Sequence, residues 1–103
     1  MGWKLEENTD EIAAVDTQIT VPLNYKVVLL NDDFTTKDFV VGILESVFHK
    51  TAVEADAIME SVHTKGSAVI GIYSYDIAST LSSIVIRNAR KNGFPLRCEL
   101  EVA

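Results

Sequence analysis

The chain has 103 residues, of which 48% are hydrophobic and 23% charged, so it has the apolar material for one modest core and no room for a second domain. Its net charge of −6 and its scattered basic residues argue against a nucleic-acid or anionic-membrane surface. The single cysteine, Cys98, rules out an internal disulfide and a cysteine-based zinc site and suits a reducing, cytoplasmic setting. The sequence shows no signal peptide and no apolar stretch of the roughly 20 residues that cross a bilayer.

The N-terminal part of the chain is predicted to be a tail. Residues 1–20 carry five acidic residues, one lysine and no sustained apolar period, so we expect a flexible segment there and a folded domain over residues 21–103. Folding is expected to begin near Pro22. The stretch YKVVLL, residues 25–30, is rich in β-branched and apolar side chains and predicts a strand buried on both faces or nearly so.

Two consecutive helices are predicted after this strand. Thr35, with Asp38 three residues later, has the form of an N-terminal cap, and apolar residues then recur at helical spacing, which predicts a helix over 36–49. Thr51 with Glu54 repeats the capping pattern ahead of a second apolar repeat, which ends at the next glycine. The two helices should pack against each other.

The remaining chain predicts a strand, a helix and a strand. In the strand AVIGIY, 68–73, Gly71 suggests a bulge or a close approach by another backbone. A helical period starts at Tyr75 and closes near Asn92, and the final stretch LRCELEV, 96–102, alternates strictly, as in a strand with one wet face. The order β-α-α-β-α-β predicts an α/β (α+β) domain in which three helices cover one face of a small three-stranded antiparallel sheet.

The polar stretch NDDFTT follows the first strand and places Asn31, Asp32 and Asp33 in a row. Turn chemistry alone can explain these residues, because Asn and Asp bond their own backbone. An EF-hand calcium site is excluded, because the twelfth position of such a loop is Gly42 rather than glutamate. A small hydrolase or metal-dependent enzyme using Asp32 and His63 stays open by spacing, although no further catalytic motif accompanies the pair.

A third possible role of the Asn31, Asp32 and Asp33 side chains is to bind a cation, and His63 could provide a further acceptor for it. His63 follows Val62 directly and Met59 by four residues, so it lies at the edge of the apolar face of the second predicted helix. A neutral imidazole nitrogen there can accept a hydrogen bond from an ammonium group. A boundary histidine with a purely structural role is the alternative.

Four segments resemble, in order, the ClpS family of adaptors that recognise N-degrons for a Clp protease: YKVVLLNDDFTTKDFVVGIL, IMESVH, GIYSYDIA and NGFPLRCELE. The resemblance runs from about Pro22 to Glu101. It implies a compact α/β fold with no catalytic residues, no metal and no cofactor. The implied ligand is the free N-terminus of a protein that begins with Leu, Phe, Tyr or Trp. The implied partner is the N-terminal domain of a Clp AAA+ unfoldase, ClpA-type or related, and the adaptor would act as a cytoplasmic monomer.

The resemblance assigns roles to individual residues. Asn31 and His63 would accept hydrogen bonds from the α-amino group of the substrate, and Asp32 would add negative charge, whereas Asp33 would fix the turn or cap the following helix. The hydrophobic pocket is assigned to Thr35, Lys37, Val40, Ile43, Met59, Val62 and Leu96. Without the resemblance, the apolar members of this set are interpreted as core residues.

Two positions depart from the family pattern. Lys37 replaces the methionine that is common at the lip of the pocket, and Leu81 replaces a lysine that typically contacts the unfoldase. Asp76 keeps an acid at another contact position. A methionine lid would collide with a β-branched first residue, so Lys37 is expected to weaken discrimination against Ile and Val. Besides an enzyme, a chaperone-docking domain that does not recognise N-termini is the alternative to an N-degron adaptor.

Overall fold

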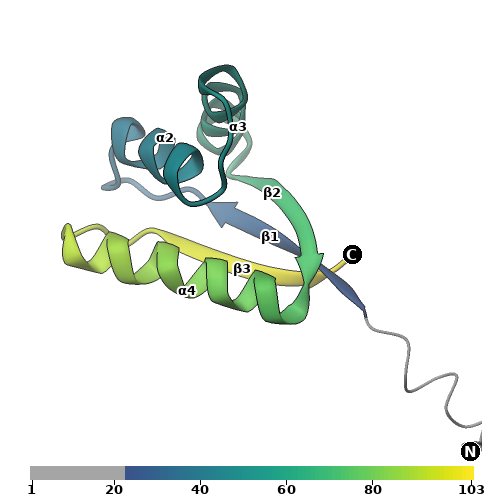
Figure 1. Ribbon diagram of the computed structural model, residues 1–103. Coiled ribbons are helices and arrows are strands. Elements are labelled where there is room, and N and C mark those ends of the chain that lie inside the picture. The colour runs from purple at the N-terminus through teal and green to yellow at the C-terminus, as the bar shows by residue number, and fades with distance from the viewer. Residues whose placement is uncertain (1–22) are drawn as a thin grey trace, which may run out of the picture.

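A computed structural model describes residues 23–103, so the predicted tail, residues 1–20, lies outside the described residues. Figure 1 shows the six elements, whose order confirms the predicted β-α-α-β-α-β arrangement. The elements are β1 (Asn24–Leu30), α2 (Lys37–Ser46), α3 (Ala52–Lys65), β2 (Ser67–Ser74), α4 (Tyr75–Lys91) and β3 (Arg97–Val102). None of the helices within residues 23–103 has the length and apolar character needed to span a membrane.

The central strand β1 pairs antiparallel with both neighbours, in the order β2-β1-β3. Val27 lies opposite Leu100 and Leu29 opposite Cys98, so the apolar side chains of β1 and β3 share a face. Val27 and Leu29 have no exposed surface and belong to the hydrophobic core. Val28 points to the opposite face and is buried, but it is not part of that core. The predicted burial of β1 on both faces is therefore met only in part.

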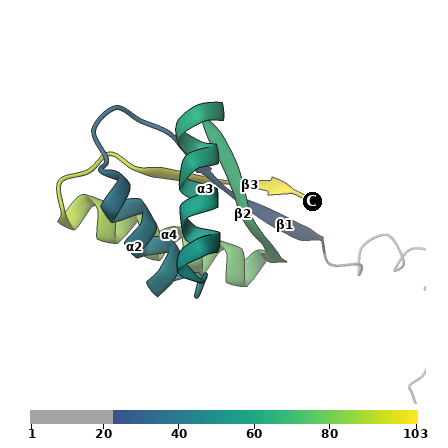
Figure 2. The ribbon, with the colours of Figure 1, turned by 90° about the horizontal axis from the view of Figure 1, so that it is seen from above.

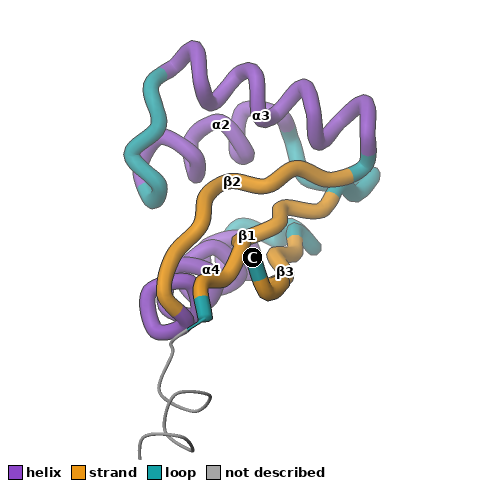
Figure 3. The backbone as a smooth tube through the Cα atoms, turned by 90° about the vertical axis from the view of Figure 1, so that its right-hand side faces the viewer, coloured by secondary structure: helices purple, strands orange, loops and turns teal. Residues whose placement is uncertain are grey.

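All three helices pack on the face of the sheet that carries the core. The core includes Leu44 from α2, Met59 from α3 and Val85 from α4 together with the inward residues of β1. Figures 1 and 3 show α2 and α3 lying together, while α4 runs alongside the strands. The predicted α/β (α+β) fold, with three helices on one face of a three-stranded antiparallel sheet, is confirmed.

The ends of α2 differ from the predicted ones. The N-terminal cap is Thr36 rather than Thr35, because the Thr36 hydroxyl accepts a hydrogen bond of 3.1 Å from the Phe39 N–H. The helix also ends at Ser46 rather than at residue 49, since His49 has a φ of 56°, which an α-helix cannot contain. The apolar repeat thus continues for one turn beyond the helix.

The ends of α3 agree with the prediction. The Thr51 hydroxyl accepts from the Glu54 N–H at 3.1 Å, and the Glu54 carboxylate accepts from the Thr51 N–H at 2.9 Å, which completes a capping box. Gly66 closes the helix with a left-handed φ of 91°, and its N–H donates to the Val62 carbonyl at 2.9 Å. The chain then turns directly into β2.

Gly71 lies at the predicted bulge. The pairing of β1 with β2 shifts register between Val27, which is opposite Gly71, and Val28, which is opposite Val69. A Cβ atom added at Gly71 would lie 2.5 Å from the hydroxyl oxygen of Tyr73, because the Tyr73 side chain covers this position. The close approach at Gly71 therefore comes from a side chain of the same strand, not from another backbone.

We expect Gly71→Ala to lower the free energy of unfolding by about 1–3 kcal/mol, because the Tyr73 ring has to move away from the new methyl group. Gly42→Ala is the matched control: a Cβ at Gly42, in the middle of α2, meets no atom within 4 Å. This substitution should raise stability by about 0.5–1 kcal/mol. Urea unfolding of both variants is the measurement, and equal stabilities would contradict the steric role of Tyr73.

Candidate functional site

A backbone hydrogen bond positions the loop that follows β1. The N–H of Asn31 donates to the carbonyl of Gly66 at 2.9 Å, so the end of β1 is held at the C-terminal end of α3. The last turn of α3 carries Val62 and His63. The bond therefore brings the first acceptor of the NDD row to the helix that carries the histidine.

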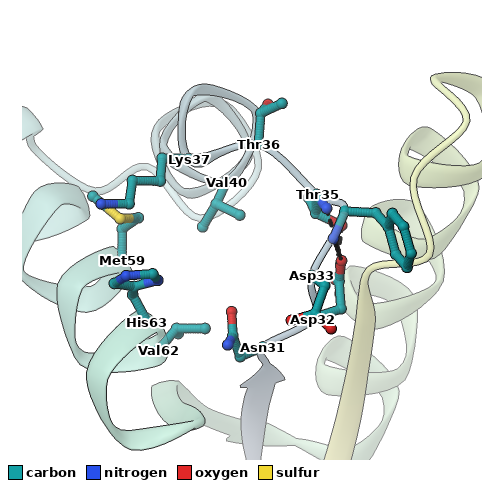
Figure 4. A pocket seen from close by; sticks show the side chains of 11 residues that line it. Asn31, Asp32, Asp33, Thr35, Thr36, Lys37, Val40, Met59, Val62 and His63 are labelled. Carbon is teal, nitrogen blue, oxygen red and sulfur yellow. Dashed lines mark hydrogen bonds between the residues drawn. The ribbon is translucent and has the colours of Figure 1, made fainter.

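A cavity of about 430 Å³ opens between this loop, the start of α2 and the second half of α3 (Figure 4). It contains most of the residues that the resemblance assigned to substrate binding. The lining residues are Asn31, Asp32, Asp33, Phe34, Thr35, Thr36, Lys37, Val40, Met59, Val62 and His63.

The cavity has an apolar wall and a polar mouth. Val40, Met59 and Val62 form the wall and are at most 9% exposed, whereas Asn31 and His63 are exposed to solvent. A site of this kind suits an apolar side chain that is attached directly to a polar group.

Asp32 shapes the loop. Its Oδ1 accepts from the N–H groups of Phe34 at 2.8 Å and Thr35 at 2.7 Å, and its Oδ2 accepts from the Thr35 hydroxyl at 2.7 Å. Burial would raise the pKa of Asp32, but the hydrogen bonds from Thr35 and Phe34 and the charge of Arg90 outweigh it and lower the pKa. The turn-fixing role predicted for Asp33 belongs to Asp32, and the Thr35 hydroxyl points to this carboxylate while the neighbouring Thr36 caps α2.

Asp33 is the other carboxylate of the cavity, and its surroundings differ. It is exposed, and no residue within 23–103 donates a hydrogen bond to its carboxylate. Both carboxylate oxygens of Asp32, in contrast, already have donors inside the loop. Of the two acids, Asp33 is thus better placed to interact with a ligand directly.

Two residues assigned to the pocket are not on its surface. Ile43 and Leu96 are 4% and 1% exposed, belong to the hydrophobic core and do not line the cavity. Ile43 is one helical turn beyond Val40, on the side of α2 that faces the core. The sequence interpretation also missed Phe34 and Thr36 as lining residues, although both belong to the loop that it singled out.

The residues assigned to unfoldase contact lie on α4, outside the cavity. Asp76 is exposed in the first turn, and Leu81 is partly buried and packs against the core. Asp76 lines a separate cavity of about 360 Å³ together with Tyr25 and Tyr75. The apolar side chain at position 81 therefore contributes to packing and is in part still exposed.

The groups needed for catalysis by a metal or a thiolate are not assembled in the described part of the chain. Within residues 23–103, no three His, Cys, Asp or Glu side chains are close enough to hold a metal ion. Burial raises the pKa of the Cys98 thiol to about 12, so the thiol stays protonated at neutral pH.

Comparison with known proteins identifies the family. The family model of the ATP-dependent Clp protease adaptor protein ClpS matches residues 20–99. The chain belongs to the ClpS family. This membership confirms the resemblance seen in the sequence, and it makes the chain a member of an adaptor family rather than of an enzyme family.

The ClpS relatives match over most of their length. The chain is 44% identical to the Treponema denticola ATP-dependent Clp protease adapter protein ClpS, over 95% of this chain and 97% of the relative. It is 54% identical to the Acetivibrio thermocellus protein of the same name over 80 residues, 78% of this chain and 81% of the relative. The structure of Agrobacterium tumefaciens ClpS2 bound to L-phenylalaninamide has a TM-score of 0.78 and 36% identity, and covers 81% of this chain and 100% of that one.

We expect Asp32→Ala to lower the free energy of unfolding by about 1–3 kcal/mol at pH 7, because the three donors in the loop lose their acceptor. Asp33→Ala is the control, and its effect should stay within about 0.5 kcal/mol. Because the pKa of folded Asp32 is lowered, its contribution is complete above the unfolded value of about 3.9 and disappears as the pH falls through the lowered value.

Urea unfolding at neutral and acid pH measures these differences. The gap between the wild type and Asp32→Ala should therefore shrink in acid. If Asp33→Ala proves as costly as Asp32→Ala, the division of roles between the two acids is wrong.

Proposed function

We propose that this ClpS-family chain binds the free N-terminus of proteins whose first residue is Leu, Phe, Tyr or Trp and delivers them to a Clp unfoldase-protease. The observation that carries the proposal is a single cavity whose apolar wall opens at the acceptors Asn31 and His63. The related ClpS2 structure supports it, because its ligand, L-phenylalaninamide, combines an apolar side chain with a free α-amine.

The α-amino group is the part of the ligand that needs the polar mouth. In unstructured peptides the pKa of an α-amino group is about 7.7–8.0, so the group is largely protonated at neutral pH and offers three N–H donors. The side-chain carbonyl of Asn31 and a neutral ring nitrogen of His63 accept two of them. Asp33 supplies negative charge at the mouth, while Asp32, which lines the same cavity, acts mainly by holding the loop in shape and adds its own charge.

The first side chain of the substrate enters the apolar part of the cavity between Val40, Met59 and Val62. Burying a Leu or Phe side chain contributes about 1.5–3 kcal/mol, and each hydrogen bond to the ammonium about 1.5–3 kcal/mol. Association itself costs several kcal/mol, so the affinity should lie nearer to about 1 μM than to about 1 nM. Binding of this strength permits release to a protease.

Delivery requires a second surface, which we assign to Asp76 and Leu81 on α4. These residues lie outside the cavity, so a substrate and an unfoldase can bind the adaptor together. The partner in this proposal is the N-terminal domain of a ClpA-type or related Clp unfoldase, and the adaptor acts as a cytoplasmic monomer. The enzyme alternative is weaker, because the Asp32 carboxylate is engaged in its own loop instead of orienting His63.

The proposed function is tested by fluorescence anisotropy with labelled peptides that differ only in their first residue. Peptides that start with Leu, Phe, Tyr or Trp should bind, and peptides that start with Ser or Glu should not. Asn31→Ala and His63→Ala should each weaken binding by about 1.5–3 kcal/mol with little loss of stability, since both side chains are exposed.

The second histidine of the chain provides the control. His49→Asn keeps a residue type that tolerates positive φ, and His49 lies outside the cavity, so peptide affinity should not change. Equal binding of all first residues, or wild-type affinity in both Asn31→Ala and His63→Ala, would favour a docking domain that does not recognise N-termini.

Lys37 should set the tolerance for β-branched first residues. It is exposed and lines the cavity on the same side as Met59 (Figure 4). Its long apolar stem can cover the first side chain while the ammonium reaches water, and it can move aside for a branch at the β-carbon. Lys37→Met should therefore raise the preference for Leu over Ile by about threefold or more.

Lys37→Met should also tighten binding of Leu and Phe peptides, most strongly at low salt, because the lysine charge repels the α-ammonium group. Lys65→Met, an exposed position outside the cavity, is the control for a general change in net charge. An unchanged Leu-to-Ile ratio together with an unchanged salt dependence would show that Lys37 does not act on the ligand.

A further inference from the structure

A second cavity adjoins the loop that forms the binding site. It measures about 520 Å³ and is lined by Phe34, Arg90, Gly93, Phe94 and Pro95. Phe34 lines both this cavity and the first one. Figure 2 shows the reason: the loop after β1 lies next to the turn that joins α4 to β3. The two cavities therefore share a boundary at one exposed aromatic side chain.

The turn that forms the other wall is held in place. Arg90 Nη1 donates to the carbonyls of Phe94 and Leu96, each at 2.9 Å, and thereby bridges the turn. The Phe94 ring packs on the Phe39 ring of α2 with their centroids 5.0 Å apart. Gly93 supplies the positive φ of 77° that the turn requires. This wall of the cavity is thus preformed, which lowers the cost of ordering when a ligand binds.

The chemistry of this surface is apolar with one positive charge. The Phe34 side chain is 73% exposed, and Pro95 is exposed as well. Arg90 has five N–H donors, and within residues 23–103 only those on Nη1 have acceptors in the turn. A single exposed aromatic residue is common on protein surfaces and does not by itself indicate a binding site. Phe34, however, lines both the proposed binding site and the second cavity.

We propose that this second cavity receives a large apolar side chain from the substrate segment that follows the first residue, an inference that rests on the proposed function. The first residue holds its α-amine at the mouth of the first cavity, so the following chain must leave across that mouth. In this proposal the chain leaves on the side of Phe34, the residue that lines both cavities. An extended chain advances about 3.3 Å per residue, so one of residues two to four would then pass Phe34. The cavity then selects Leu, Phe or Trp there, and Arg90 disfavours Lys.

The test uses isothermal titration calorimetry with peptides that begin with Phe and carry Leu, Ser or Lys at position two, three or four. At one of these positions, Leu should bind about three- to tenfold more tightly than Ser, and Lys should bind no more tightly than Ser. Pro95→Ser should remove the gain from Leu. This position is exposed and does not line the first cavity, so the variant should fold and bind L-phenylalaninamide like the wild type.

The outcomes separate this inference from the proposed function. If L-phenylalaninamide binds but Leu gives no gain at any of the three positions, the second cavity is not a subsite. A gain from Leu that persists in Pro95→Ser likewise overturns the inference, because the contact then lies elsewhere. If L-phenylalaninamide itself fails to bind, the proposed function is wrong and the inference falls with it.

Discussion

One hydrogen bond, from the Asn31 N–H to the Gly66 carbonyl, fixes the geometry on which the site depends. It joins the end of the central strand to the end of α3, and the adjacent pairing of Leu30 with Ser67 continues the same contact into the sheet. Gly66 can take part because its left-handed φ lets the chain reverse from helix to strand in one residue. As a result, His63 and Asn31, which are distant in the sequence, line the same cavity.

The two acidic residues of the loop have different roles: Asp32 maintains the conformation of the loop, and Asp33 places a negative charge at the cavity. Asp32 uses both oxygens to hold Phe34 and Thr35, which turns the chain from β1 towards α2 and sends the Phe34 ring outward. Asp33 keeps its carboxylate at the cavity and at the solvent. A rigid loop matters here, because acceptors held in place before the ligand arrives need not be ordered when it binds. Substitutions of the two acids should therefore act on different quantities, stability for one and affinity for the other.

The sequence allowed the fold to be predicted closely, because α4 and β3 have clear periods, β1 is a continuous apolar run, and the capping box and terminal glycine of α3 are unambiguous local signals. The sequence could not show which of two adjacent residues of the same type has a given role. Thr35 and Thr36, or Asp32 and Asp33, have the same chemistry one residue apart, and only the path of the loop determines which side chain turns inwards. Ile43 lies one turn beyond Val40 on the same face of α2, but Val40 lines the cavity and Ile43 lies in the core. The hydrophobic period of the sequence shows which face of a helix is buried, and it does not show how deeply each residue on that face is packed.

The central claim is that the polar mouth recognises a free α-amino group. The most direct measurement compares L-phenylalaninamide with N-acetyl-L-phenylalaninamide by isothermal titration calorimetry at neutral pH. The two ligands carry the same apolar side chain, but the acetylated one has no ammonium to donate to Asn31 and His63. The account predicts measurable binding of the free amine and loss of binding on acetylation. Equal affinity for both ligands would contradict it and would show that the cavity recognises only the apolar side chain.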